Sequence, residues 1–479
     1  MNDDNSFSMA TAPFLKSGGM TTVRFPAGSA YGDLYHWSTN TPTPYKGIAN
    51  GYWASGSTFA SVVQLVDKIG TTLGVVNYGS NQAGTGGGEP CEAAAWVAYA
   101  NGDPSDGKGI GKDSGGHDWG TVGKWALIRS QVPLSVDDGF NSLRIGHPAP
   151  LNIRLWQIGN QVYNNGYYGG EHVGEPDLHA PAPAGPKDFG KLHKNPSLSP
   201  TFYGARLIEF AGAMKAVDPN ILIGASLVTP PDAMIWASDW NSSVLKKACQ
   251  DIDFVTLEWV TGTVMPPDWK TLDESNLLGN VRSQLNTMFA AVLSEDKASC
   301  PKNHTPRIAF SPAGVIPYPK VDRPVVEALW VADVYALLVE SGSVNISLPS
   351  LYSDIMISND RKKVGPAYLG MQMLHYIAHI PGDAMVDATS SNSNLAAHAT
   401  MRRDGVFGLM LVNKDPASAM AVKVNILGGQ VGTKARRFDY GIAQQKAGSG
   451  ITPVKMDDVS GDFLVTVPAY TITDILIEK

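Results

Sequence analysis

Apolar segments of two kinds alternate along most of the chain. One kind is short and rich in β-branched residues, as buried strands are, and comprises 21–26, 73–78, 153–158, 221–227, 252–257, 307–310 and 343–348. The other repeats its apolar residues at helical spacing and comprises 59–69, 91–99, 203–217, 278–293, 325–339 and 365–378. Strands that alternate with helices predict an α/β fold with a parallel sheet wrapped by helices.

The number of strands raises a question about the start of the chain. The seven strand segments are one short of the eight in a (β/α)8 TIM barrel. Before Thr21 there is a helical pattern at Ala10–Lys16 but no apolar strand. We therefore expect either an irregular first strand or a chain that begins inside a once complete barrel.

The pattern changes near Met385. The segments 396–401, 407–413, 421–426, 435–440, 462–467 and 471–477 are short, alternate in polarity and are separated by turns. This pattern predicts an all-β sandwich. We expect a barrel domain over residues 1–383 and a C-terminal β-sandwich over residues 384–479.

Composition narrows the classes of partner. Hydrophobic residues make up 43% of the 479 positions and charged residues 17%, as in ordinary globular proteins. The net charge is −7 and there is no basic run, so nucleic acid and anionic membranes are poor partners. No apolar stretch reaches the roughly 18–20 residues that a membrane span requires.

The three cysteines and the histidines predict no metal site and no cofactor, because neither follows a zinc or haem spacing and no H-E-x-x-H motif occurs. Cys249 and Cys300 either form a disulfide in an exported protein or are buried thiols.

The polar N-terminus does not have the pattern of a signal peptide. A late start codon or a lost export segment would explain both the missing signal-peptide pattern and the missing strand before Thr21.

Several segments carry a resemblance to one group of enzymes. They are 24–37 (RFPAGS…DLYHW), 77–80 (NYGS), 92–101 (EAAAWVAYAN), 156–161 (WQIGNQ), 214–219 (MKAVDP) and 253–259 (DFVTLEW). Together, and in this order, they resemble segments of α-L-arabinofuranosidase-like glycosidases, family 51 and its relatives in clan A. The resemblance covers roughly residues 10–479. It implies a (β/α)8 barrel with a C-terminal β-domain, an oligo- or polysaccharide as ligand, and an extracellular or periplasmic location.

The residues that would carry the family's chemistry are replaced. A retaining glycosidase needs two carboxylic acids about 5–5.5 Å apart. The resemblance places the acid/base at Gln161 and the nucleophile at Pro312. An amide can hydrogen-bond a sugar oxygen, but it is neither an acid nor a base at neutral pH, and proline offers no nucleophile. We therefore expect a pseudoenzyme that binds carbohydrate and has lost retaining hydrolysis.

Glu258 adds a carboxylate where the family's strand ends in His, an aromatic residue and Tyr. One interpretation is a relocated catalytic carboxylate, which would keep the protein an active glycosidase. The other, which we favour, is an ion pair or a hydroxyl acceptor, because one carboxylate without a partner cannot run the two-step mechanism. The candidate partners lie in the loop after Gln161 and are Glu171, Glu175 and Asp177.

The remaining site residues follow from the resemblance and from aromatic chemistry. The resemblance implies that Asn160 binds the sugar 2-hydroxyl and that Arg24 supports the catalytic centre, although both are equally explained by packing. Apolar aromatic faces stack on sugar rings, whereas we expect Trp96 and Trp125 in the core. The expected substrate-binding set is Arg24, Trp37, Asn77, Trp156, Asn160, Tyr163, Tyr168, Glu171 and Trp259, with Tyr167 as a further aromatic candidate.

A third hypothesis remains beside the binding protein and the active enzyme. The old barrel site could be filled or covered in a structural or assembly protein at the cell surface. The sequence leaves a protein partner or a homo-oligomer open, and it does not identify the sugar.

Overall fold

The computed structural model describes most of the chain. The described residues are 9–26, 32–44, 57–164, 176–181, 195–230, 238–261, 279, 281–301, 304–315, 324–346, 356–358, 361–379, 382–429, 431–456 and 459–479, with backbone only at 259–261 and 311–315. The chain divides into two compact units. The first comprises Met1–Ala12, Thr21–Glu258 and Met288–Ser311, and the second comprises Pro13–Met20, Trp259–Thr287 and Pro312–Lys479.

A parallel sheet of seven strands forms the nearly closed barrel. Its order is β1 (Thr22–Phe25), β4 (Thr71–Val76), β5 (Leu155–Ile158), β6 (Leu222–Ser226), β7 (Phe254–Thr261), β8 (Arg307–Val315) and β9 (Asn345–Ile346). These strands fall on the predicted segments, so the predicted barrel is confirmed. Between Met9 and Thr21 the structure describes the short helix α1 (Ala12–Ser17) after a 3-10 turn, and no strand.

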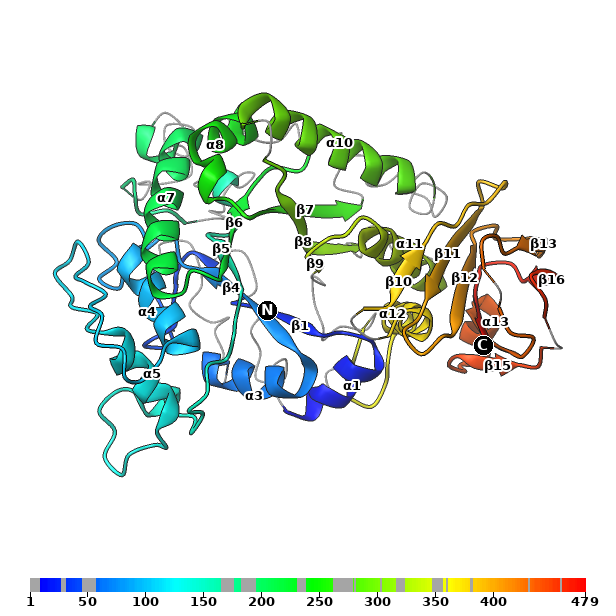
Figure 1. Cartoon of the computed structure of the whole chain (residues 1–479), viewed down its shortest axis with the longest axis horizontal. Coiled ribbons are helices and arrows are strands. Elements are labelled where there is room, and N and C mark those ends of the chain that lie inside the picture. The colour runs from blue at the N-terminus through cyan, green and yellow to red at the C-terminus, as the bar shows by residue number, and fades with distance from the viewer. Residues whose placement is uncertain are drawn as a thin grey trace. The chain divides into compact units, whose positions relative to one another are not determined.

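Helices cover the outer side of the strands in the first unit (Figure 1). They are α3 (Phe59–Ile69), α4 (Pro90–Asn101), α5 (Val122–Ser130), α7 (Pro200–Val217), α8 (Trp240–Ala248) and the end of α10 (Val281–Ser299). Local sequence sets their ends: the Thr58 hydroxyl accepts from the Ser61 N–H at 3.0 Å and caps α3. We did not predict α8, because its buried Trp240, Val244 and Leu245 are separated by polar residues.

Two glycines allow the barrel strands to pack closely against aromatic rings. A Cβ on Gly74 would lie 2.6 Å from the ring of Trp156, which is its partner on β5. A Cβ on Gly224 would lie 2.3 Å from the ring of Phe254 on β7. Such distances are shorter than any van der Waals contact, so these positions exclude side chains.

Aromatic rings of α3, α4 and β5 pack together with the ring of Trp37 in one cluster. Trp37 stacks on Trp96 with ring centroids 6.0 Å apart and an interplanar angle of 6°. Trp96 also meets Phe59 and Trp156 edge to face, at 5.1 and 5.3 Å. All of these rings are almost completely buried, so they form a core, as predicted for Trp96 and Trp125.

The second unit contains two barrel helices and the C-terminal sheets. The helices are α11 (Val325–Glu340), which is buried on nearly all sides, and α12 (Pro366–Ile377). The antiparallel six-stranded sheet has the order β10 (Ala384–Val386), β11 (Leu395–Met401), β12 (Phe407–Asn413), β17 (Thr471–Ile477), β14 (Ala435–Gly441) and β15 (Thr452–Val454). A second sheet pairs β13 (Met420–Asn425) with β16 (Asp462–Val467), and apolar residues of both sheets pack together, which confirms the predicted sandwich. The boundary at 383/384 stays a prediction.

The sequence left open whether Cys249 and Cys300 are bonded, and the structure joins them. Cys249 and Cys300 form a disulfide across 51 positions of sequence, and Cys91 is a free thiol. Cys249 follows α8 and Cys300 follows α10, so the bond joins the ends of two neighbouring barrel helices.

Candidate functional site

The polar residues expected at the active site lie on three strands of the first unit. Arg24 belongs to β1, Asn160 and Gln161 follow β5, and Glu258 belongs to β7. In a parallel barrel the carboxyl ends of the strands meet at one edge, where active sites lie. The fold therefore brings these four residues to the same end of the barrel.

Arg24 joins β1 to the turn after β5. Its guanidinium donates hydrogen bonds to the side-chain oxygens of Asn160 and Gln157, the latter at 3.4 Å. The Gln157 amide in turn donates to the backbone oxygen of Gly159 at 2.8 Å. From the sequence we assigned separate roles to Arg24 and Asn160 and did not predict that their side chains bond to each other.

Asp33 also holds this turn in place, and from the sequence we assigned it no role beyond its position in the DLYHW segment. Its two carboxylate oxygens accept from the backbone N–H groups of Asn160 and Tyr78, at 3.1 and 3.3 Å. Burial raises the pKa of Asp33 well above its usual range, and the nearby Asp177 raises it further. Asp33 is therefore a positioning group whose oxygens are both occupied.

Gln161 has an unusual backbone and an unsatisfied side chain. Its φ of 45° lies in the left-handed region, directly after Gly159 at φ 70° and Asn160. Its Oε1 is buried, and no hydrogen-bond donor reaches it among the residues that the structure describes. A buried acceptor without a partner costs roughly 1–3 kcal/mol.

Glu258 is the one acidic side chain of this set that lies on a strand. Burial raises its pKa to about 8, although the positive charge of Arg24 acts in the opposite direction. Its backbone oxygen accepts from the Thr229 hydroxyl after β6. At pH 7 the Glu258 carboxyl is therefore mainly protonated and neutral.

Three aromatic residues predicted to stack on sugar are instead buried, which corrects that prediction. Trp37, Trp156 and Tyr163 expose 1%, 0% and 5% of their surfaces. The indole N–H of Trp37 donates to the backbone oxygen of Glu92, and that of Trp156 to Ile153. These rings fill the core because large apolar surfaces are most stable there, and they present no face to a ligand.

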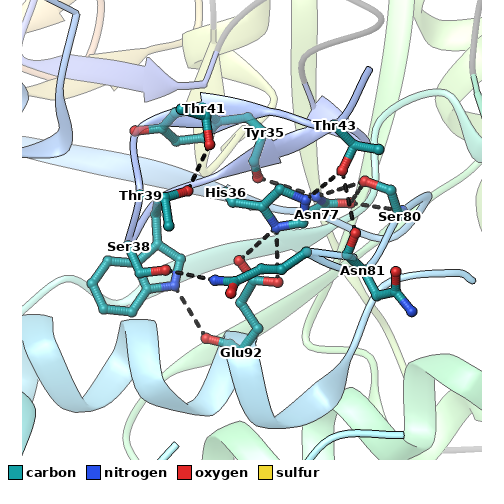
Figure 2. A network of polar contacts seen from close by, with 12 residues as sticks. Tyr35, His36, Ser38, Thr39, Thr41, Thr43, Asn77, Ser80, Asn81 and Glu92 are labelled. Carbon is teal, nitrogen blue, oxygen red and sulfur yellow. Dashed lines mark hydrogen bonds and ion pairs between the residues drawn. The ribbon is translucent and has the colours of Figure 1, made fainter. Parts of the chain in front are cut away.

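Asn77 also differs from its prediction as a substrate-binding residue. Its amide donates to the Tyr35 backbone oxygen at 3.2 Å and to the Ser80 hydroxyl at 3.1 Å, while its oxygen accepts from the Ser80 N–H at 3.0 Å. Figure 2 shows it inside a wider polar network with His36 and Glu92. Its hydrogen-bonding groups are used within the protein.

That network explains why the NYGS and EAAAW segments occur together. The Glu92 carboxylate of α4 lies 2.8 Å from His36 Nδ1, and His36 Nε2 lies 2.7 Å from the Thr43 hydroxyl (Figure 2). His36 belongs to β2 (Tyr35–His36), which pairs with β3 (Thr41–Pro42). The segments that carry the resemblance thus fix this hairpin on α4, which is a structural role.

Several predicted site residues cannot be placed. Tyr167, Tyr168, Glu171 and Glu175 lie outside the described residues, as do the side chains of Trp259 and Pro312. Asp177 is described: it is buried, and its carboxylate lies 2.7 Å from Nδ1 of His179. Among the described helices, none is long and apolar enough to cross a membrane.

Comparison with known proteins bears on the fold. No protein-family model matches the sequence, and no curated protein matches it. Solved structures do match. The α-L-arabinofuranosidase from Thermotoga maritima in complex with arabinose has a TM-score of 0.65 at 17% identity, covering 98% of this chain and 90% of its own.

Two further structures widen this comparison. The family 51 α-L-arabinofuranosidase from Bifidobacterium longum has a TM-score of 0.64 at 15% identity, covering 99% of this chain and 91% of its own. A family 44 xyloglucanase from Paenibacillus polymyxa has a TM-score of 0.62 at 10% identity, covering 97% and 94%. The chain thus has the fold of clan A glycoside hydrolases, barrel and β-sandwich together, and at these identities the likeness concerns the fold.

Proposed function

We propose that this protein binds an oligo- or polysaccharide at the carboxyl end of its barrel and does not hydrolyse it by the retaining mechanism. The glycosidase-like fold supports a carbohydrate as ligand. The observation that carries the proposal is the buried Oε1 of Gln161, for which the described residues provide no hydrogen-bond donor. A ligand hydroxyl that donates to this oxygen would satisfy it.

The backbone at Gln161 supports the same proposal. A residue other than glycine at φ 45° occupies a sparsely populated conformation, and such conformations concentrate at ligand sites. The preceding Asn160 is fixed by Arg24 on its side chain and by Asp33 on its backbone. The protein thus holds Gln161 in a defined position, although none of the described residues donates to its side-chain oxygen.

The proton chemistry of the described residues does not fit a retaining glycosidase. That mechanism needs one ionised nucleophile and one carboxylic acid. Gln161 supplies neither, and Glu258, with a pKa raised to about 8 by burial, is mostly neutral at pH 7. A neutral acid is a hydrogen-bond donor but a poor nucleophile.

A second candidate function rests on that same pKa. A buried carboxylic acid that is protonated at neutral pH is suited to act as a general acid. If Glu258 protonates a leaving oxygen, the protein is a glycosidase with a relocated acid and needs a base or nucleophile from the residues not described. In that case turnover declines above about pH 8, where Glu258 ionises, and Glu258→Gln abolishes it.

The test combines glycan binding with turnover. A glycan array selects a ligand, calorimetry measures its affinity, and aryl glycosides of several sugars report hydrolysis. We expect binding without turnover, and about tenfold weaker binding in Gln161→Ala, the effect of losing one hydrogen bond. Gln284→Ala on the exposed face of α10 is the matched control and should bind as the unmodified protein does.

Two outcomes would decide against the proposal. Hydrolysis by the unmodified protein that Glu258→Gln removes would establish the second candidate. The absence of any glycan ligand, or equal affinity in Gln161→Ala, would remove the binding site proposed here. Arylglycosidase activity gained by the double variant Gln161→Glu with Pro312→Glu would support an inherited loss of catalysis.

We further propose that the protein is exported. Disulfides persist in oxidising compartments and are rare in the cytosol, so the bond between Cys249 and Cys300 supports an extracellular or periplasmic location. Fractionation of the native host with an antibody against the chain tests this, with the protein expected outside the cytosol.

A further inference from the structure

Four potential metal ligands lie close together in the first unit, and two of them are the cysteines of its disulfide. The sulfurs of Cys249 and Cys300, a carboxylate oxygen of Asp296 and a ring nitrogen of His304 all lie within 4.8 Å of one another. Asp296 is in the last turn of α10, Cys300 follows that helix, and His304 lies in the connection to β8. A disulfide needs neither the carboxylate nor the imidazole, so their presence calls for another explanation.

The donor set matches zinc. Zinc sites with structural roles have four ligands drawn from Cys sulfur, His nitrogen and carboxylate oxygen, in tetrahedral geometry. With metal–ligand bonds of roughly 2.0–2.3 Å, the donors of such a site lie about 3.3–3.8 Å apart. The widest donor pair, at up to 4.8 Å, would have to approach by about 1 Å, whereas the two sulfurs would move apart once reduction breaks the bond between them.

The histidine is already held as a zinc ligand would be. His304 Nε2 lies 3.2 Å from the backbone oxygen of Ile252, and its Nδ1 lies 2.6 Å from the Asp296 carboxylate. Metal-bound histidines usually donate their other ring N–H to such a carbonyl, which fixes the tautomer. A proton on Nε2 leaves the lone pair of Nδ1 directed to the side where Asp296 lies.

Burial makes the cluster a closed site and not a chance surface grouping. Cys249 exposes 6% and Asp296 2% of their surfaces, and Cys300 and His304 are half-buried. The backbone oxygen of Leu245 lies 2.7 Å from the Cys249 sulfur and 3.8 Å from that of Cys300, so both sulfurs face one pocket of backbone. The site connects the ends of α8 and α10 at the start of β7 and β8, the end of the barrel away from Glu258.

We propose that Cys249, Asp296, Cys300 and His304 form a zinc site in the reduced protein, and that the disulfide replaces the metal on oxidation. Reduction takes two electrons from a dithiol, which itself becomes a disulfide, and leaves two protein thiols. Zinc binding then releases the two thiol protons and forms two zinc–thiolate bonds. The newly made chain would fold around zinc in a reducing compartment. After export, a disulfide donor of the oxidising compartment would accept two electrons from the two thiolates and be reduced to two thiols, while the Cys249–Cys300 bond forms and the zinc ion is released.

Zinc content of the full-length protein tests the proposal. The chain is reduced with a phosphine, which competes little for zinc, and compared with the oxidised chain after exhaustive dialysis against zinc. We expect about one tightly bound zinc in the reduced protein and none in the oxidised protein. Cobalt in place of zinc should give the near-ultraviolet charge-transfer band of a thiolate–cobalt bond in the reduced protein alone.

Variants separate this site from adventitious binding. His304→Gln and Asp296→Asn should weaken zinc binding by more than about 100-fold, because even groups that only support a ligand contribute roughly 10–100-fold. Cys91→Ser removes the free thiol elsewhere in the unit and should bind zinc normally. Reduced protein that shows no thiolate–cobalt band, or His304→Gln that retains full affinity, would overturn the proposal. The cobalt spectrum needs only the unmodified chain, so a variant that fails to fold does not remove the test.

Discussion

The guanidinium of Arg24 donates a hydrogen bond to the side-chain oxygen of Asn160 and thereby ties β1 to the turn that carries Gln161. The same cation acts on Glu258: burial raises the pKa of that carboxyl to about 8, and Arg24 lowers it. Arg24 thus positions the turn and also limits how far burial raises the pKa of Glu258.

Replacement of Arg24 should move the pKa of Glu258 upward. Arg24→Met removes the positive charge that, among the described residues, opposes the effect of burial, so we expect a pKa above about 8. Arg24→Lys keeps a positive charge and should shift the pKa less. Carbon-detected NMR of protein labelled at the glutamate carboxyls measures this value, and Glu258→Gln assigns the signal. An unchanged or lower pKa in Arg24→Met would show that the two groups do not interact.

Glu258 should also make the protein less stable as pH rises. Its pKa is about 8 in the fold against an ordinary 4.5, so between these values the folded state binds more protons than the unfolded state. The free energy of unfolding then falls with rising pH, by at most about 1.4 kcal/mol per pH unit. Glu258→Gln removes this contribution, so its stability relative to the unmodified protein should grow from pH 5 to pH 8 in urea titrations.

Glu327 provides the matched control for that experiment. It is a second buried carboxyl, on α11, and burial raises its pKa to about 7. Glu327→Gln should therefore gain relative stability up to about pH 7 and little beyond it. A difference between the two variants that does not widen from pH 7 to pH 8 would contradict the assignment to Glu258.

The architecture was predictable from the sequence because it rests on repeated patterns. Buried strands such as β4 and β6 are continuous apolar runs, and α11 and α12 repeat their apolar residues at helical spacing. Helix α8 was missed because it buries one face through residues separated by polar ones. A short polar helix has too few turns for its period to stand out.

The candidate site was less predictable, because sequence spacing does not reveal which way a side chain points. Gln161 and Glu258 were found from their positions at strand ends. Trp37 and Asn77 lie in segments of the same resemblance, yet they turn inward and serve packing and a polar network. Asp33 gave no local signal, since its partners Tyr78 and Asn160 are distant in sequence.

The burial of Trp37 leads to a prediction that separates core from site. Trp37→Leu removes most of a stacked ring from the aromatic core and should lower the free energy of unfolding by about 3 kcal/mol. Glycan affinity of the folded variant should be unchanged, because the ring has no exposed face. Gln161→Ala should show the opposite pattern, with weaker binding and little loss of stability. Lost affinity in folded Trp37→Leu would restore Trp37 to the binding site.

The second unit should depend on a buried charge cluster around His398 of β11. Its Nε2 lies 3.0 Å from Asp333, its Nδ1 lies 2.6 Å from Glu340, and Lys414 pairs with Asp333. Burial opposes charge here, but His398 and Lys414 hold the pKa of Asp333 at about 2. Burial likewise opposes the charged form of His398, yet the two carboxylates raise its pKa above the usual value.

Opposite pH limits follow for these two residues. The stability that Asp333 contributes is present above its ordinary pKa of 3.8 and is lost as pH falls toward 2. The contribution of His398 is complete below its ordinary pKa of 6.5 and is lost as pH rises through the raised value.

Asp333→Asn should cost roughly 3–5 kcal/mol at pH 6, since it leaves buried charges unpaired. Asp404→Asn, which breaks a pair between Arg402 and an exposed carboxylate, should cost less than about 1 kcal/mol. Denaturant titrations followed at the second unit measure both values, and equal losses in the two variants would mean that the buried cluster adds no more than a surface pair.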